Sequence, residues 1–136
     1  MLRGLLAALL LIFTVPAAAK AAEEGRPINQ LRVYEIFESN KAAFHDRFRD
    51  HAVRIMARHG FKILSMWEAK REDRTEFVYL LQWKDEAEMK AAWAAFMADA
   101  EWAEIKRITA ADHGRLVGEI EEKTLVATPY SAPLAP

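Results

Sequence analysis

The chain has 136 residues, which is the size of a single domain. It carries 19 Lys and Arg residues against 20 Asp and Glu residues, and this near balance argues against a protein that binds nucleic acid through a basic surface. There is no Cys, which excludes disulfides, thiolate metal sites and thiol catalysis. Because 52% of the residues are hydrophobic, the sequence predicts a folded domain rather than a disordered chain.

Residues 1–19 are typical of a secretory signal peptide. Arg3 gives a positive start, an apolar run covers residues 5–15, and small residues follow up to Ala19. The apolar run is shorter than the roughly 20 residues that a membrane-spanning helix needs, so we expect cleavage after Ala19 or Ala21 and no stable membrane insertion afterwards. The prediction is an exported protein, periplasmic or secreted. A membrane anchor and a buried N-terminal helix are the alternatives.

The first half of the mature chain predicts a leader, a strand and a helix. Residues 20–29 are small, charged and interrupted by Gly and Pro, which indicates a flexible leader. Residues 31–37 alternate and are rich in β-branched and aromatic side chains, which is typical of a strand. The apolar residues of 41–59 form one stripe at helical spacing, and Gly60 stands where a left-handed residue closes a helix.

The second half of the chain repeats the order of strand and helix. A polar turn at residues 71–74 separates two strands that form a hairpin, and Asp85 with Glu88 three residues later resembles a capping box. In chain order we expect strands at 61–69 and 75–83, a helix that includes 89–97, a helical segment that opens at 101–102, a last strand at 117–128 and a Pro-rich tail at 130–136.

The resulting order is β-α-β-β-α-β. Two such split units predict an α+β, ferredoxin-like domain over residues 30–129, in which an antiparallel sheet carries both helices on one face. In such a sheet the face without helices meets water, and its strands alternate between apolar and polar residues.

The predicted strands are apolar on both faces, so the sheet needs a second cover. An exposed apolar sheet would exceed the few hundred Å² of contiguous patch that monomers tolerate. A second copy, packed sheet to sheet, gives a homodimeric barrel; the alternative is that the last strand and the tail fold back over the sheet. In the strand at 31–37, the two faces are expected to carry Leu31, Val33 and Phe37 on one side and Tyr34 and Ile36 on the other. In the strand at 61–69, they carry Phe61, Ile63 and Trp67 against Leu64 and Met66. In the strand at 75–83, they carry Phe77, Tyr79, Leu81 and Trp83 against Val78 and Leu80.

Several short motifs, in this order, resemble the NIPSNAP family. They are Leu31-Arg32-Val33-Tyr34-Glu35, then Arg58-His59-Gly60-Phe61 followed by Trp67, then Ala92-Trp93 through Phe96, then Asp99-Ala100-Glu101-Trp102. The resemblance covers about residues 30–129, with Ala100 where the family usually has Pro and Ser65 where Gly is common. It implies a dimeric α+β barrel of the type found in antibiotic-biosynthesis monooxygenases, and it brings no defined reaction.

Five residues are candidates for the lining of a ligand pocket inside the barrel. Arg32 and Tyr34 share a face of the first strand, and a buried Arg needs a carboxylate or an anionic ligand. Trp67 and Tyr79 provide aromatic surface for a flat organic molecule. His59 ends the first helix on its apolar stripe, where it serves as a proton carrier, as an axial ligand of a haem, or as a capping residue.

Each candidate also has an ordinary structural role. Arg32 could pair with Glu68 or Glu76, and the aromatic rings could be core. No metal site is expected, because no pair of His residues has the i, i+4 spacing of a zinc motif. No cofactor is expected either, and haem is the one exception considered. No catalytic residue is assigned.

The function predicted from the sequence is therefore an exported homodimer that binds a small, partly apolar ligand or a protein partner. The alternative is an enzyme of the dimeric α+β barrel type: a cofactor-free monooxygenase or isomerase, or a haem-handling enzyme. An enzyme requires Arg32, Tyr34 and His59 to converge in one pocket. A structural or adaptor protein is a third class, and it requires a fully packed interior.

Overall fold

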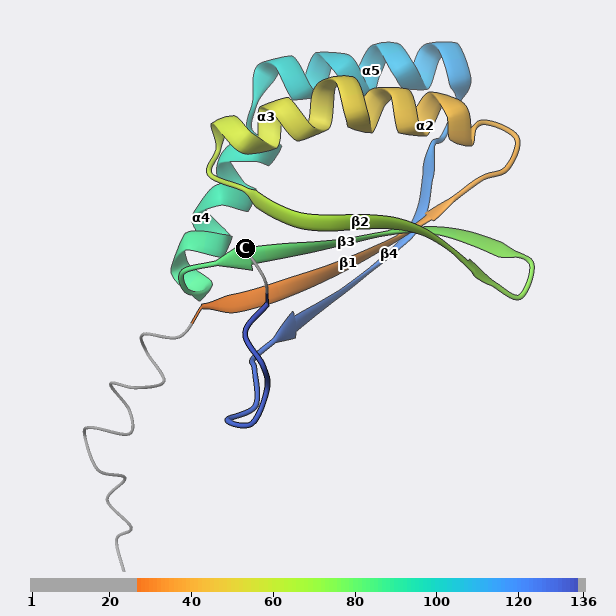
Figure 1. Cartoon of the computed structure of the whole chain (residues 1–136). Helices are drawn as coiled ribbons and strands as arrows, with labels where there is room; N and C mark the ends of the chain where they lie inside the picture. Colours follow the sequence, from red (N-terminus) through yellow and green to blue (C-terminus); the bar gives the residue numbers. More distant parts are fainter. Residues whose placement is uncertain (1–26, 135–136) are drawn as a thin grey trace, which may run out of the picture.

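The computed structural model describes residues 27–134, which form a sheet with helices on one of its faces (Figure 1). The predicted signal peptide at 1–19 and most of the predicted leader lie outside the described residues. No helix within 27–134 is long and apolar enough to cross a membrane. In chain order the elements are β1 (Ile28–Ile36), α2 (Lys41–Arg47), η1 (Phe48–Ala52), α3 (Val53–Arg58), β2 (Lys62–Arg71), β3 (Arg74–Trp83), α4 (Glu86–Met97), α5 (Ala100–His113) and β4 (Val117–Leu125).

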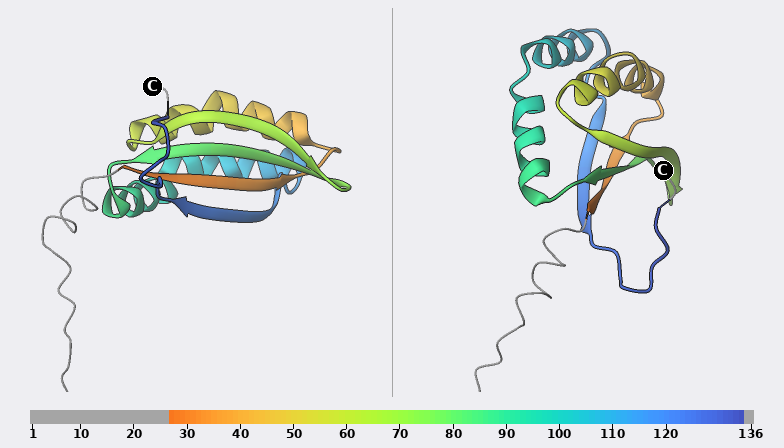
Figure 2. Two further views of the ribbon diagram at one scale, coloured as in Figure 1. Left: turned by 60° about the horizontal axis from the view of Figure 1, so that its bottom comes forward. Right: turned by 60° about the vertical axis from the view of Figure 1, so that its left-hand side comes forward.

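The strands of this region form one antiparallel sheet in the order β2-β3-β1-β4. The two central strands β1 and β3 come from different halves of the chain, which is the arrangement of a ferredoxin-like fold. Figure 2 shows the helices gathered on one side of the sheet and the C-terminal tail on the other. The α+β, ferredoxin-like prediction is confirmed.

The helix predicted at 41–59 forms, with a π-helical turn in its middle. The turn is η1, between α2 and α3. Phe44, Phe48, Ala52 and Met56 repeat every four residues, and in an α-helix such a repeat drifts by about 40° each time. A π-helical turn has more residues per turn, so it keeps Phe48 and Ala52 on the buried stripe with Phe44 and Met56.

This helix ends at a Schellman motif around Gly60. The Gly60 N–H donates to the Ala57 carbonyl at 3.1 Å, and the Phe61 N–H donates to the Met56 carbonyl at 3.1 Å. Gly60 has a φ of +83°, a conformation that glycine adopts without a Cβ penalty. The predicted role of Gly60 is confirmed, and the motif turns the chain directly into β2.

The polar turn and the second helix start are also as predicted. Glu72 in the hairpin turn has a φ of +58°. The Asp85 carboxylate accepts a hydrogen bond from the Glu88 backbone N–H at 2.8 Å and caps α4. The Glu88 carboxylate accepts from the Lys84 N–H at 2.6 Å, one residue earlier than in a regular capping box.

The alternation predicted for β3 is correct. Its buried residues Phe77, Tyr79, Leu81 and Trp83 face the helices, and Val78 and Leu80 face the opposite, open side. On β1, Arg32 and Tyr34 lie opposite Tyr79 and Phe77, so they share the helix side.

The faces predicted for the second strand and the ends predicted for the first and last strands were wrong. In β2 a bulge between Ile63 and Ser65 shifts the register, so Ile63 pairs with Leu81 on the helix side while Trp67 pairs with Val78 on the open side. An uninterrupted alternation would place Ile63 and Trp67 on one face, as predicted. The residue inserted at the bulge reverses the alternation after it, so the two side chains lie on opposite faces. Two strand boundaries also differ: Phe37 was expected in the first strand, but β1 ends at Ile36, and the last strand, expected to reach residue 128, ends at Leu125.

The open side of the sheet is apolar at its centre and charged towards the hairpin end. Leu31, Val33, Val78 and Leu80 are half-buried there, and Trp67 is 49% exposed. Residues 126–134 arch over the opposite end of this face, leaving a space of about 530 Å³ between the tail and the sheet (Figure 2). The tail therefore covers one end of the open face and leaves Trp67 uncovered.

Candidate functional site

A cavity of about 360 Å³ lies between the helices and the β1–β4 half of the sheet. We call it the helix–sheet cavity. Its volume falls within the range of small-molecule sites. Its lining comes from both layers: Arg32, Tyr34, Val117 and Ile120 from the sheet, and Phe44, Arg47, Phe48, Ala52, Met56, Trp93, Phe96, Met97, Trp102 and Lys106 from the helices.

The sheet wall of the cavity carries a polar group of three residues. An Arg32 Nη2–H donates to the Tyr34 hydroxyl at 3.3 Å, and the Tyr34 and Tyr79 hydroxyls are 2.7 Å apart. Tyr79 is fully buried behind Tyr34. Burial, together with the neighbouring Tyr34, raises the pKa of Tyr79 well above its ordinary value. The Tyr79 hydroxyl is therefore neutral at physiological pH and acts as a hydrogen-bonding group.

Arg32 is held between a carboxylate and an aromatic ring. Its guanidinium pairs with Glu122 of β4 and lies 4.4 Å from the centre of the Trp93 ring. The partners considered from the sequence, Glu68 and Glu76, were wrong, because Glu68 lies on β2, which is not next to β1, and Glu76 lies on the opposite face of the sheet from Arg32. The Arg32 side chain is 12% exposed and its Nε–H has no partner among residues 27–134.

Gln30 holds the Trp93 ring of the cavity wall, and the sequence did not identify it. It is 3% exposed, and its Oε1 accepts from Trp93 Nε1–H at 2.8 Å and from Trp83 Nε1–H at 3.2 Å. A buried indole N–H needs an acceptor. The four Trp residues of this small domain were therefore the sequence signal that a buried polar side chain such as Gln30 is needed to accept their hydrogen bonds. The bonds hold Trp93 in place as a wall of the cavity.

The helix wall carries two further cations, which the sequence analysis also missed. Arg47 donates to Thr109 Oγ1 at 3.1 Å, and its guanidinium carbon lies 5.6 Å from the centre of the Trp102 ring. Lys106 Nζ lies 5.8 Å from the same ring centre. Burial lowers the pKa of Arg47, although a guanidinium stays charged. On a helix such residues look like an ordinary solvated face, so no sequence signal marked them.

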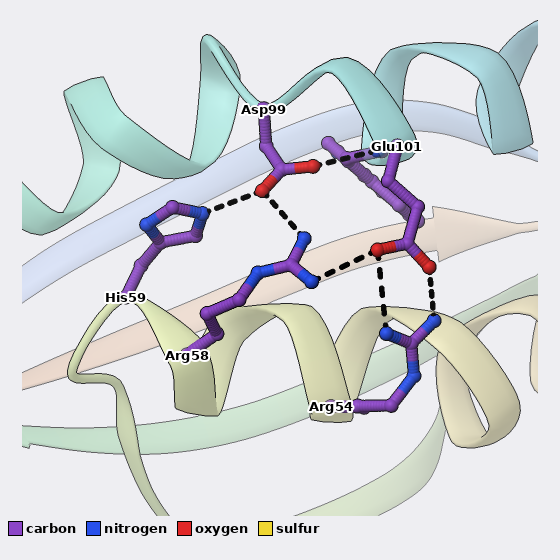
Figure 3. Close-up of polar contacts among 6 residues, drawn as sticks. Arg54, Arg58, His59, Asp99 and Glu101 are labelled. Atoms are coloured by element: carbon purple, nitrogen blue, oxygen red, sulfur yellow. Dashed lines mark hydrogen bonds and ion pairs between the residues drawn. The ribbon is translucent and has the colours of Figure 1, made fainter.

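His59 lies outside the cavity. Its Nε2 is 2.7 Å from Asp99 Oδ2, which also accepts from Arg58 at 2.7 Å (Figure 3). The other Asp99 oxygen accepts from the Trp102 N–H at 3.0 Å and caps α5. These contacts hold the pKa of Asp99 well below its usual range, with His59 as the first cause. His59 thus joins the end of α3 to the start of α5.

The structure brings together some of the candidate residues and separates others. Arg32 and Tyr34 line the helix–sheet cavity, and Tyr79 supports them from behind. Trp67 lies on the open side of the sheet, and His59 belongs to the cluster of Figure 3. His59, the haem ligand considered from the sequence, is not among the lining residues, so it is not placed to ligate a haem in this cavity.

The comparisons with known proteins assign the chain to a family. The NIPSNAP family model matches residues 29–132. This protein belongs to the NIPSNAP family. An uncharacterised NIPSNAP-like domain protein from Burkholderia xenovorans has a similar structure, with a TM-score of 0.68 at 20% identity over 82% of this chain and 94% of the other. No functionally curated protein showed significant similarity.

Two further solved structures extend the likeness of this NIPSNAP domain. A NIPSNAP family protein from Agrobacterium tumefaciens has a TM-score of 0.67 at 13% identity, covering 78% of this chain and 97% of the other. An antibiotic biosynthesis monooxygenase has a TM-score of 0.50 at 13% identity, covering 75% of this chain and 99% of the other. At such identities the likeness shows the fold alone, and it carries no reaction over to this NIPSNAP domain.

Proposed function

We propose that this NIPSNAP domain is an exported homodimer that binds a small, partly apolar molecule in the helix–sheet cavity. The observation that carries the proposal is the composition of the cavity wall. Aromatic and aliphatic side chains make up most of it, and a few fixed polar groups, among them Arg32 and Tyr34, point into it. This combination is typical of small-molecule sites. A purely structural domain would instead have a filled interior.

The polar groups of the cavity favour binding over catalysis. Acid–base catalysis needs a group that exchanges protons near neutral pH. The Tyr79 hydroxyl has a raised pKa, Arg32 stays charged, and His59 lies elsewhere. Arg32, Tyr34 and His59, the residues considered for an enzyme, therefore do not converge in one pocket.

The open side of the sheet supports the homodimer. Its apolar centre would meet water in a single copy, and a second copy would cover it. The charges of this side also suit a two-fold pairing. Glu35, Glu76, Glu119 and Glu121, with Arg71 and Arg74, lie towards the hairpin end, whereas Lys62 and Lys123 lie at the other end. In an antiparallel pair of copies, the acidic end of one meets the basic end of the other.

Sedimentation equilibrium at micromolar concentration tests the dimer. We expect two chains per particle for the native protein, and one for Val78→Glu, which places a charge at the centre of the open side. Ile108→Glu is the matched control, because Ile108 is 44% exposed on α5 and lies on the helix layer, away from the open side. A native protein that sediments as one chain, or a Val78→Glu dimer as tight as the native one, would refute the interface.

Export and ligand content are tested on protein purified from its own cells. The intact mass should begin at Lys20 or Ala22, in the periplasmic or secreted fraction. The unfolded protein should release a small molecule in an amount comparable to the number of chains. A full-length mass in the cytoplasmic fraction contradicts export, and protein that neither releases nor takes up any small molecule contradicts binding.

A further inference from the structure

The cations that line the helix–sheet cavity outnumber its acids. Arg32, Arg47 and Lys106 all line it, and no Asp or Glu does. Arg32 has a carboxylate partner in Glu122. Within residues 27–134, neither Arg47 nor Lys106 forms an ion pair with a carboxylate. The helix wall thus presents two positive charges without a protein counter-ion.

The acids nearest to Arg47 along the chain are committed to other partners. Asp46 and Asp50 both pair with Arg49, at 2.9 and 2.7 Å. The hydrogen-bond partner of Arg47 in the described region is Thr109, whose own hydroxyl is 2.8 Å from the Ile105 carbonyl and can donate to it. A guanidinium has five N–H donors, so most of those of Arg47 are free to bind a ligand.

The position of these cations defines what they can bind. Both lie within 6 Å of the Trp102 ring centre, so they stand beside an aromatic surface rather than on an open polar one. A charge at the edge of a partly desolvated cavity is stabilised by an anion of complementary geometry. Trp93 and Phe96 also line the cavity, and the Phe96 ring stacks on Trp102 with 5.1 Å between the ring centres, so these rings provide surface for an apolar body.

We propose that the ligand of the helix–sheet cavity is a small organic acid, whose carboxylate binds Arg47 and Lys106 and whose apolar ring packs against Trp93 and Trp102. This inference rests on the proposed function, and it names the chemical class of the ligand. The charge of Arg32 is neutralised by Glu122, so Arg32 and Tyr34 contact the far end of the ligand as a polar, uncharged surface.

The test compares pairs of probes that share an apolar ring, one member carrying a carboxylate and the other an uncharged hydroxymethyl group. Calorimetry at pH 7 measures the binding of 2-naphthoate and 2-naphthylmethanol, with benzoate and benzyl alcohol as a smaller pair. We expect each acid to bind about tenfold or more tightly than its alcohol, because a hydrogen bond to a charged group adds more than one to a neutral group. Arg47→Gln and Lys106→Gln should each remove most of this difference and leave the affinity for the alcohols unchanged.

Lys90→Gln is the matched control. It removes the same charge from α4 outside the cavity, where Lys90 is 71% exposed and pairs with Glu86. It should bind the acids as the native protein does. Urea unfolding of every variant shows whether its fold is intact. The results for Arg47→Gln and Lys106→Gln are compared with each other, so that a fold defect in one variant does not decide the test.

The possible results separate the two proposals. If acids and alcohols bind equally, or if both Gln variants keep the preference for acids, the charge inference is wrong and the binding cavity remains. If neither member of either pair binds at millimolar concentration, the cavity is not a binding site and the inference is wrong with it.

Discussion

The hydroxyl pair of Tyr34 and Tyr79 makes an asymmetric prediction. Tyr34→Phe leaves the fully buried Tyr79 hydroxyl without its partner at 2.7 Å, and an unsatisfied buried group costs about 1–3 kcal/mol. Tyr79→Phe leaves the Tyr34 hydroxyl bonded to Arg32 at 3.3 Å, so it costs about 1 kcal/mol, the value of one hydrogen bond. The double variant leaves no orphaned hydroxyl. It should lose less free energy of unfolding than the two single losses added together.

Urea unfolding, followed by tryptophan fluorescence, gives the four free energies of this cycle. We expect a coupling energy of about 1 kcal/mol between the two hydroxyls. A useful control is Tyr130→Phe, because Tyr130 is 89% exposed in the tail and its hydroxyl should not matter. Strictly additive losses, or a larger loss for Tyr79→Phe than for Tyr34→Phe, would refute the hydrogen-bond network described for the sheet wall.

Three further predictions concern stability. Gly60→Ala should cost about 1 kcal/mol in urea unfolding, because a Cβ is disfavoured at a φ of +83° although space surrounds it; an unchanged midpoint would contradict the Schellman motif. Gly118→Ala should cost about 0.5–1.5 kcal/mol, because its Cβ would lie 2.1 Å from Glu35 Oε2 and displace this carboxylate from the next backbone N–H; the same change in Glu35→Ala protein should be nearly neutral. The free energy of unfolding should fall at both ends of the pH range. Above pH 10 the unfolded chain loses the proton that native Tyr79 retains, so stability drops as pH rises, and Tyr79→Phe should weaken this drop. Lys70 and Thr75 lower the pKa of Glu38 to about 2, so the stability that Glu38 contributes is present above its ordinary pKa of 4.5 and is lost as pH falls towards 2; a flat acid profile would contradict this.

The sequence predicted the fold well, because local signals and the global topology agree. Gly60 and the Asp85 cap mark helix boundaries through backbone chemistry that neighbouring residues determine. The β1 pairing with β3 follows from the order of elements. The faces of β2 could not be predicted in the same way, since the bulge after Ile63 inserts one residue that no composition marks.

The site was predictable only on its sheet wall. Arg32 and Tyr34 share a face because strand periodicity is two, and that relation is visible in any strand. The helix wall depends on how α2 and α5 pack against each other, which brings Arg47 and Lys106 to one indole ring. For His59 the sequence pattern was misleading. Its place on an apolar stripe suggested the interior of the domain, whereas its contact with Asp99 holds it at the junction of α3 and α5.

The four tryptophans of the chain provide the most direct test of the binding cavity. Their indole N–H signals can be resolved by two-dimensional NMR of ¹⁵N-labelled protein, before and after addition of 2-naphthoate. Trp93 and Trp102 line the cavity, whereas Trp67 lies on the open side of the sheet. We predict that the Trp93 and Trp102 signals shift with saturating dependence while the Trp67 signal stays in place. Shifts confined to Trp67, with those of Trp93 and Trp102 unchanged, would contradict a ligand site between the helices and the sheet.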